Sequence, residues 1–306
     1  MPRAVAIAII ANLLGGTSYV LTKVALAGLT ETSLVVVRTL VALAVLVPLT
    51  WPAVVDVLRV RGRDRTRLLA MGGAGYALPL ALASYGIRRS SATNASLLIG
   101  VEPLAVVILG VIVLGESLRP ARIAALALGT VGATMLVAEG VPFVAVAYEP
   151  HVTGDLLLIA SAFAWGIYTI AGKRLLVRYD AQALSAASLA VALPCLVPLA
   201  VVETVGAARA PGQLVPALIA AIVLGLSVSG LMTVLWNTAL RSMDASRLAG
   251  FIFLQPLAGV LLARIALGEP LSAAAAAGGT LILAGVLLLV REERSANAPR
   301  ASAHIA

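Results

Sequence analysis

Apolar runs of about 20 residues recur from one end of this chain to the other, separated by short polar segments. A helix of that length crosses the roughly 30 Å of hydrocarbon in a bilayer, because each residue adds about 1.5 Å. Of the 306 residues, 61% are hydrophobic and 12% are charged, and the mean hydropathy is +1.04. Globular domains have about 25% charged residues. The composition therefore excludes an ordinary water-soluble domain and indicates a membrane protein with many spans.

Ten uncharged stretches are long enough to cross a bilayer as helices. Residues 105–114, for example, are apolar on every face, whereas a membrane β-barrel needs strands in which apolar and polar residues alternate. We therefore predict an all-α integral membrane protein with ten transmembrane helices. A cleaved signal peptide explains the first stretch less well, since Asn12 and Lys23 fit no small-residue cleavage pattern. The predicted spans are residues 4–22, 33–51, 68–87, 92–114, 121–138, 153–172, 182–202, 214–239, 245–267 and 272–290.

The net charge of +8 follows from basic residues that gather on one side of the predicted spans. With a cytoplasmic N-terminus, 16 of the 22 lysines and arginines face the cytoplasm and four face the other side, which is the positive-inside pattern. We expect a multi-pass protein of the cell (inner) membrane, surrounded by membrane lipids, with both termini cytoplasmic. The basic run at 59–67 is interpreted as an orientation signal, and a patch for anionic lipid or nucleic acid is the alternative. No nucleic-acid partner is expected.

Residues that carry chemistry are too few for a catalytic or metal centre. Cys195 is the only cysteine, and His151 and His304 are the only histidines, so a haem, zinc or iron–sulfur site lacks ligands. The sequence also has no aspartate-rich metal motif and no nucleophile paired with a base. We predict neither an enzyme nor a cofactor. Residues 291–306 are polar and without periodicity, and we expect a disordered cytoplasmic tail there.

The two halves of the chain resemble each other in sequence. The tetrapeptide LVPL occurs at 46–49 and again at 196–199, an offset of 150 that also aligns Lys23 with Lys173. At an offset of 153, seven residues of the segment 92–118 recur without a gap, among them a proline and a Gly-Glu pair. Such matches indicate an internal duplication.

The duplication predicts two structural repeats, residues 1–140 with spans one to five and residues 141–290 with spans six to ten. Because five is odd, the second repeat would enter the membrane from the opposite side. Inverted repeats of this kind are typical of carriers that alternate between outward-open and inward-open states, although they also build channels.

Several segments carry a likeness to a known family. These are GGTSYVLTK at 15–23 with WGIYTIAGK at 165–173, and two long blocks at 90–118 and 244–271, each of which has a proline in the middle and ends in L-G-E-x-L. With these segments and an arginine in the second span, residues 4–290 resemble the EamA-like branch of the drug/metabolite transporter superfamily. The resemblance implies ten helices in two five-helix repeats and a central cavity lined by spans 1, 3, 4, 6, 8 and 9.

The resemblance also implies the function. It suggests a secondary transporter of a small metabolite or drug, most often an exporter of amino acids or related solutes. An importer, or a lipid or nucleotide-sugar carrier of the same fold, is the alternative, and protons are a candidate coupling ion. Two departures matter: Leu14 replaces the tryptophan usual before the glycine, and Gln255 stands where the first block has Glu102, which leaves one carboxylate in the middle of the membrane.

Glu102 and Arg38 are ionisable residues inside predicted spans, and such residues are functional candidates by default. Glu102 lies about ten residues into its span and is a candidate proton carrier, with a helix-stabilising pair as the alternative. Arg38 is a candidate anchor for a substrate carboxylate, since guanidinium binds carboxylates with two parallel hydrogen bonds. Structural pairing, for instance with Glu102, is the alternative.

The remaining site candidates are polar or aromatic residues on the presumed cavity spans and two prolines at matched positions. For the polar ones, interhelical hydrogen bonds are the alternative, and for the aromatic ones helix packing is. The prolines are candidate hinges, because each removes a helical hydrogen bond. The candidates for substrate binding or transport are Asn12, Ser18, Tyr19, Arg38, Tyr76, Asn94, Glu102, Trp165, Tyr168, Trp236, Asn237 and Gln255, and the hinges are Pro103 and Pro256.

Glu116 and Glu269 end the fourth and ninth predicted spans at equivalent positions. We expect helix-end carboxylates paired with nearby arginines such as Arg119, and a role in gating is the alternative. Lys23 and Lys173 also occupy equivalent helix ends, where lysine side chains reach toward the membrane surface. Glycines in the third and eighth spans are expected to permit close packing of helices.

Overall fold

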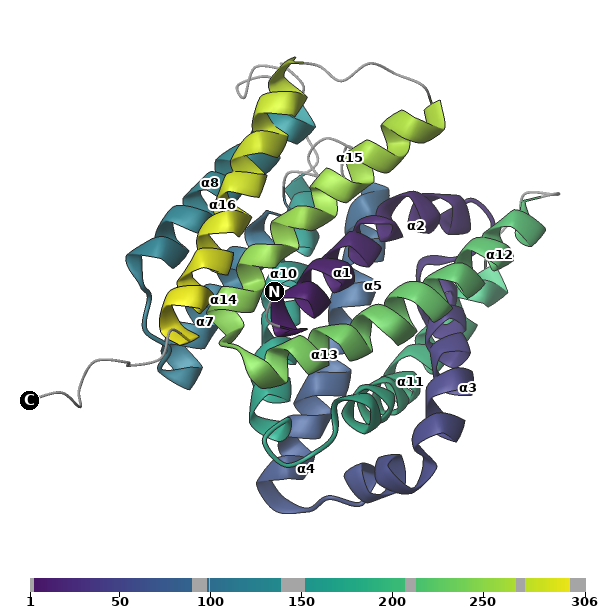
Figure 1. Ribbon diagram of the computed structural model, residues 1–306. Coiled ribbons are helices and arrows are strands. Elements are labelled where there is room, and N and C mark those ends of the chain that lie inside the picture. The colour runs from purple at the N-terminus through teal and green to yellow at the C-terminus, as the bar shows by residue number, and fades with distance from the viewer. Residues whose placement is uncertain are drawn as a thin grey trace, which may run out of the picture.

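The computed structural model describes residues 3–89, 98, 100–138, 152–206, 213–267 and 273–297. Every element within these residues is helical, in agreement with the predicted all-α class. Figure 1 shows the helices gathered into one bundle. The elements are α1 (Arg3–Gly16), α2 (Ser18–Leu26), α3 (Glu31–Leu58), α4 (Gly62–Leu69), η1 (Ala70–Ala77), α5 (Leu78–Arg89), α7 (Val101–Leu114), α8 (Pro120–Ala138), α10 (Val152–Leu175), α11 (Ala181–Gly206), α12 (Leu214–Leu224), η2 (Gly225–Met232), α13 (Thr233–Ser242), α14 (Ala245–Ala249), η3 (Gly250–Phe253), α15 (Leu254–Leu267) and α16 (Ala273–Asn297).

Six helical stretches in the described part of the chain are long and apolar enough to cross a membrane. A seventh apolar helix, α7, is shorter. These stretches agree with a multi-pass membrane protein, and the count of ten stays a prediction. The six are Arg3–Leu26, Glu31–Leu58, Gly62–Arg89, Val152–Leu175, Ala181–Val205 and Leu214–Ser242.

Two of these long helices contain a π-helical segment in the middle. η1 connects α4 to α5, and η2 connects α12 to α13, so each wide turn is flanked by α-helix on both sides. A π segment has one more residue per turn than the α-helix, and such segments are frequent at functional sites. Neither π segment was predicted from the sequence.

Local sequence explains several helix ends and bends. The Thr30 hydroxyl accepts a hydrogen bond from the Ser33 backbone N–H at the start of α3, as an N-cap residue does. The same helix bends at Thr50, whose φ of −125° and ψ of 17° are not helical, between two prolines. α7 ends at Gly115, which has a φ of +70° that residues with a Cβ rarely adopt.

Helices from the two halves of the chain pack against each other. α8 lies along α16, and α3 lies along α11 (Figure 1). α10, from the second half, packs against η1, α5 and α7 from the first half. Elements also follow in a similar order in both halves: α7 and α15 each have 14 residues and begin 153 positions apart.

The bundle has two ends that differ in charge. The basic end, low in Figure 1, holds the α3–α4 connection, the C-terminal end of α10 with Lys173 and Arg174, and the α13–α14 turn. The opposite end holds Lys23 of α2 and the C-terminal end of α5.

One expectation about the C-terminus is wrong in detail. The tail was expected to be disordered from residue 291, but α16 continues as a helix to Asn297. The physical reason lies in Glu292, whose carboxylate forms ion pairs with Arg122 at 3.1 Å and with Arg119 at 3.6 Å. These contacts fix the last part of the helix against α8.

Candidate functional site

A cavity of about 350 Å³ occupies the middle of the bundle. α1, α2, η1, α5, α7, α10, η2, α13 and α15 contribute to its wall, and α3 adds Arg38. Apart from α3, these elements fall in the spans that the resemblance implied. The wall reaches Lys23 and Ile87 near the opposite end, and in the described part of the chain it includes no residue of the α13–α14 turn at the basic end.

The structure brings eight of the twelve proposed transport residues together in this wall. They come from both halves of the chain, so the cavity lies between the halves. The eight are Ser18, Arg38, Tyr76, Glu102, Trp165, Tyr168, Trp236 and Gln255.

Two of the remaining candidates are buried outside the wall. Asn12 has no exposed surface; its Nδ2 donates to the Ala8 carbonyl at 2.8 Å, and its Oδ1 accepts from Gln255 Nε2 at 3.0 Å. Asn237 is equally buried, and its Nδ2 donates to the hydroxyls of Tyr168 and Ser185, both at 2.8 Å. Both asparagines therefore make the interhelical contacts that were the alternative interpretation, and each holds a residue of the wall in place.

The side chains of the last two candidates are not described by the structure. Asn94 lies outside the described residues, and of Tyr19 only the backbone is described, in α2. Their proposed roles stay predictions.

Arg38 is a buried cation on the wall. Its side chain is 6% exposed, and its Nε donates to Ser229 Oγ of η2 at 2.8 Å. The π segment thus supplies the hydroxyl that orients the guanidinium. The ion pairs found among the described residues include none between Arg38 and Glu102. Ser229 was not predictable as the partner of Arg38, because the two residues are 191 positions apart.

Glu102 is the second residue of α7 and is partly exposed in the cavity. It is the acidic member of the described wall, and Arg38 and Lys23 are its basic members. The cavity therefore combines one carboxylate with cationic groups held apart from it, in a wall that is otherwise mostly apolar.

Three aromatic rings form a cluster on one side of the cavity. The Tyr76 and Trp165 centroids are 5.9 Å apart, those of Trp165 and Tyr168 are 5.7 Å apart, and both pairs meet edge to face. Gly75 makes the cluster possible, because a Cβ there would lie 2.5 Å from the Tyr168 backbone. The Tyr76 hydroxyl is buried and has no hydrogen-bond partner in the described part of the chain.

Each of the two candidate hinge prolines follows a short irregular stretch of backbone. Pro103 is the third residue of α7, after Gly100, and Pro256 is the third residue of α15, after the 3₁₀ segment η3. α14, η3 and α15 follow one another without a gap from Ala245 to Leu267, so Pro256 lies near the middle of one helical stretch, whereas the residues before Pro103 are described only in part. The irregular backbone therefore comes before each proline, at matched positions in the two halves.

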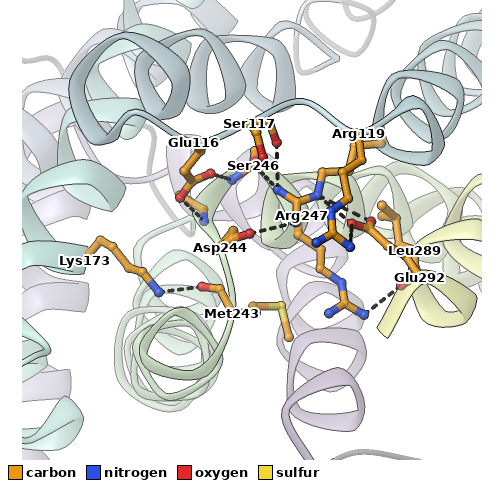
Figure 2. A network of polar contacts seen from close by, with 12 residues as sticks. Glu116, Ser117, Arg119, Lys173, Met243, Asp244, Ser246, Arg247, Leu289 and Glu292 are labelled. Carbon is orange, nitrogen blue, oxygen red and sulfur yellow. Dashed lines mark hydrogen bonds and ion pairs between the residues drawn. The ribbon is translucent and has the colours of Figure 1, made fainter. Parts of the chain in front are cut away.

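A network of polar contacts closes the basic end (Figure 2). Both carboxylate oxygens of Glu116 accept backbone N–H groups, from Ala245 and from Ser246, at 2.8 Å each. Lys173 Nζ donates to the carbonyls of Leu240 and Met243, both at 2.7 Å. The two side chains together hold both sides of the α13–α14 turn.

Glu116 therefore does not pair with Arg119, which was the expected partner. Its acceptors are satisfied by backbone groups because the turn at Gly115 directs the carboxylate at the start of α14. Arg119 instead lies 3.6 Å from Glu292. Of the equivalent Glu269 the structure describes nothing.

Arg122 is the centre of the same network and was missed by the sequence analysis. It is 5% exposed and forms ion pairs with Asp244 at 2.7 Å and with Glu292 at 3.1 Å. Its Nη1 also donates to Ser246 Oγ at 2.9 Å. One arginine thus connects α8 to the α13–α14 turn and to α16. Its three side-chain partners lie more than 120 positions away in sequence, so no local pattern identified them.

Comparisons with known proteins agree with this geometry. The model of the EamA-like transporter family matches residues 2–138 and 152–291. An uncharacterized transporter of Archaeoglobus fulgidus is 30% identical over 76% of this chain and 78% of its own length. A probable terminal-alkyne amino-acid exporter of Streptantibioticus cattleyicolor is 30% identical over 76% of this chain and 75% of its own. A probable amino-acid metabolite efflux pump of Salmonella typhimurium is 26% identical over 64% and 66%.

A solved crystal structure has the same fold. It superposes with a TM-score of 0.77 at 22% identity and covers 96% of this chain and 99% of its own. Six long apolar helices, the central cavity and the family match point to the same conclusion. This chain is a multi-pass membrane protein that belongs to the EamA-like transporter family.

Proposed function

We propose that this protein exports an amino acid or a related small solute across the cell membrane by alternating access. One observation carries the proposal: Arg38, Glu102 and the aromatic cluster share one cavity. The cavity wall extends toward the end opposite the basic end, and a polar network closes the basic end. The basic end is cytoplasmic in this proposal, as are both termini, and the membrane is the inner membrane.

Arg38 is the anchor for a substrate carboxylate. Its Nε is engaged by Ser229, while its two terminal nitrogens have no hydrogen-bond partner among the described residues. A carboxylate fits such a fork with two parallel hydrogen bonds.

Glu102 is the proposed partner for a positive charge, either the substrate ammonium or a proton. In the cavity it can accept the ammonium of an amino acid or carry a proton, because it is the acidic member of the described wall. Proton coupling would follow if loading the substrate requires the carboxylate to lose its proton. The edge-to-face rings of Tyr76, Trp165 and Tyr168 then surround the rest of the solute.

The network around Glu116, Lys173 and Arg122 keeps the cytoplasmic side shut in this state. Transport requires these contacts to break while the opposite end closes. Two inverted repeats, residues 1–140 and 141–290, would exchange conformations in this step, and the irregular backbone before Pro103 and Pro256 is where bending is proposed.

The names of two relatives, an amino-acid exporter and an amino-acid metabolite efflux pump, support the direction and the substrate class. The test is efflux from cells that express this chain and are loaded with labelled amino acids, nucleosides or cationic drugs, with and without a protonophore. Faster and saturable loss of amino acids, absent in an Arg38→Met variant of equal abundance in the membrane, is the expected result. Unchanged loss of every solute from cells with the protein in the membrane would overturn the proposal of export.

A further inference from the structure

The last part of α3 has the character of a segment that lies at a membrane surface. After the bend at Thr50 the ribbon turns across the basic end toward α4 (Figure 1). Val54 and Val57 are buried on its inner side, whereas Trp51 is 61% exposed. Exposed tryptophan beside a membrane helix is typical of the interface between lipid and water. The end of α3 and the neighbouring α3–α4 connection are therefore expected at the level of the lipid headgroups.

A second hollow, of about 570 Å³, lies where this segment meets α4 and α11. Three arginines line it: Arg59, Arg61 and Arg65. The rest of its wall is aliphatic and includes Leu58 and Leu69, which are 44% and 49% exposed. The hollow thus has a cationic part in the polar connection between the helices and an apolar part on the helices themselves.

In the described part of the chain, the arginines of this hollow form no ion pair. The described residues also place no carboxylate in its wall. Asp64, the acidic residue of α4, is engaged elsewhere: it pairs with Arg67 at 3.0 Å and with Arg178 at 3.1 Å. An orientation signal needs basic residues on one side of the membrane, but it does not need three of them around one hollow.

We propose that this hollow binds an anionic phospholipid of the surrounding leaflet. The three guanidinium groups take the phosphate and any further anionic group of the head, because guanidinium binds phosphate with paired hydrogen bonds. Leu58 and Leu69 lie where the acyl chains leave the headgroup. This complementarity favours a lipid over a free phosphate ion, because a free phosphate would make no contact with the apolar part of the wall.

The test uses the full-length protein in detergent and native mass spectrometry with added phosphatidylglycerol or phosphatidylcholine. The variant is Arg61→Gln with Arg65→Gln. The matched control is Arg3→Gln with Arg63→Gln, which removes the same charge from exposed arginines that do not line the hollow. We expect the parent to retain phosphatidylglycerol preferentially, the variant to retain it about 30-fold less, and the control to resemble the parent, because the variant removes two of the three guanidinium groups of the hollow.

Three outcomes would overturn the proposal. They are equal retention of the two lipids by the parent, equal losses in the variant and the control, and displacement of phosphatidylglycerol by inorganic phosphate at equal concentration. The last would show that the phosphate alone accounts for binding. If the double variant is not recovered from the membrane, the single substitutions Arg61→Gln and Arg63→Gln give the same comparison with a smaller expected difference.

Discussion

Glu116→Gln tests whether the polar network at the basic end controls access to the cavity. The Glu116 carboxylate accepts two backbone hydrogen bonds of 2.8 Å at the α13–α14 turn. A hydrogen bond to a charged group contributes about 1.5–3 kcal/mol. Glutamine keeps one acceptor oxygen, so the substitution removes about one such bond. Since 1.4 kcal/mol is a factor of ten, we expect the closed state to lose about 10-fold to 100-fold in population relative to the open one.

The assay measures how fast a thiol in the cavity is labelled from the basic end. Cys195 is exposed and would react, so the background is Cys195→Ser with Ala162→Cys, a position in the cavity wall. A membrane-impermeant thiol reagent is added to sealed vesicles of known orientation. The labelling rate from the basic end should rise in Glu116→Gln by about the same factor as the open population.

The matched control is Glu203→Gln at the opposite end of the bundle. Its carboxylate also accepts a backbone N–H, from Thr32 at 3.0 Å, and it accepts hydrogen bonds from the Thr32 and Tyr85 hydroxyls. This variant loses a comparable contact without touching the basic end, so its labelling from that side should equal that of the parent. An unchanged rate in Glu116→Gln, in protein that melts at the same temperature as the parent, would refute the reasoning.

Three other substitutions address the cavity. Glu102→Gln should abolish proton-coupled transport while leaving exchange of substrate intact, and an unchanged pH dependence of transport would contradict a proton-carrying role. Arg38→Gln should weaken binding of a carboxylate substrate by about 10-fold to 100-fold, measured by calorimetry in detergent; an unaltered dissociation constant would remove Arg38 from the site. Gly75→Ala should destabilise the protein by about 1–3 kcal/mol and lower its melting temperature, because the new Cβ would lie 2.5 Å from the Tyr168 backbone. Gly73→Ala, whose Cβ would have no neighbour closer than 4.0 Å, is its control, and equal destabilisation of both would argue against the contact.

Some residues of the cavity wall were predictable, because burial of an ionisable group in the membrane has a large free-energy cost. Arg38 and Glu102 stand out in the sequence because an ionisable group in hydrocarbon needs a wet or polar surrounding, and both line the cavity. Asn12 and Asn237 also stand out, but a neutral amide can hydrogen-bond to neighbouring helices, as Asn12 does to Gln255 and Asn237 does to Tyr168 and Ser185. Polarity alone therefore does not separate wall residues from those that support the wall.

The network at the basic end was not predictable from local sequence. Glu116 binds backbone groups, which every residue offers, so no side-chain pattern marks its partners. Arg122 meets Asp244 and Glu292, which come from distant parts of the chain. The π segments were hidden for a different reason: Gly72 and Gly75 in η1 were interpreted as small residues for close packing, and that signal does not reveal an extra residue in a turn.

The π segment η1 changes which side of a helix faces which neighbour. Each residue of an α-helix advances the side chains by about 100°, because 3.6 residues make a turn. An added residue in the middle of the helix therefore rotates everything after it relative to everything before it. The stretch Gly62–Arg89 directs Asp64 toward Arg178 in its first turn and Tyr76 into the cavity after the wide turn begins. Deletion of a single residue from η1 would leave a continuous helix in which α5 turns a different face toward α10. In this fold, the insertion of one residue can therefore change which side chains of a helix face its neighbours without moving the ends of the helix.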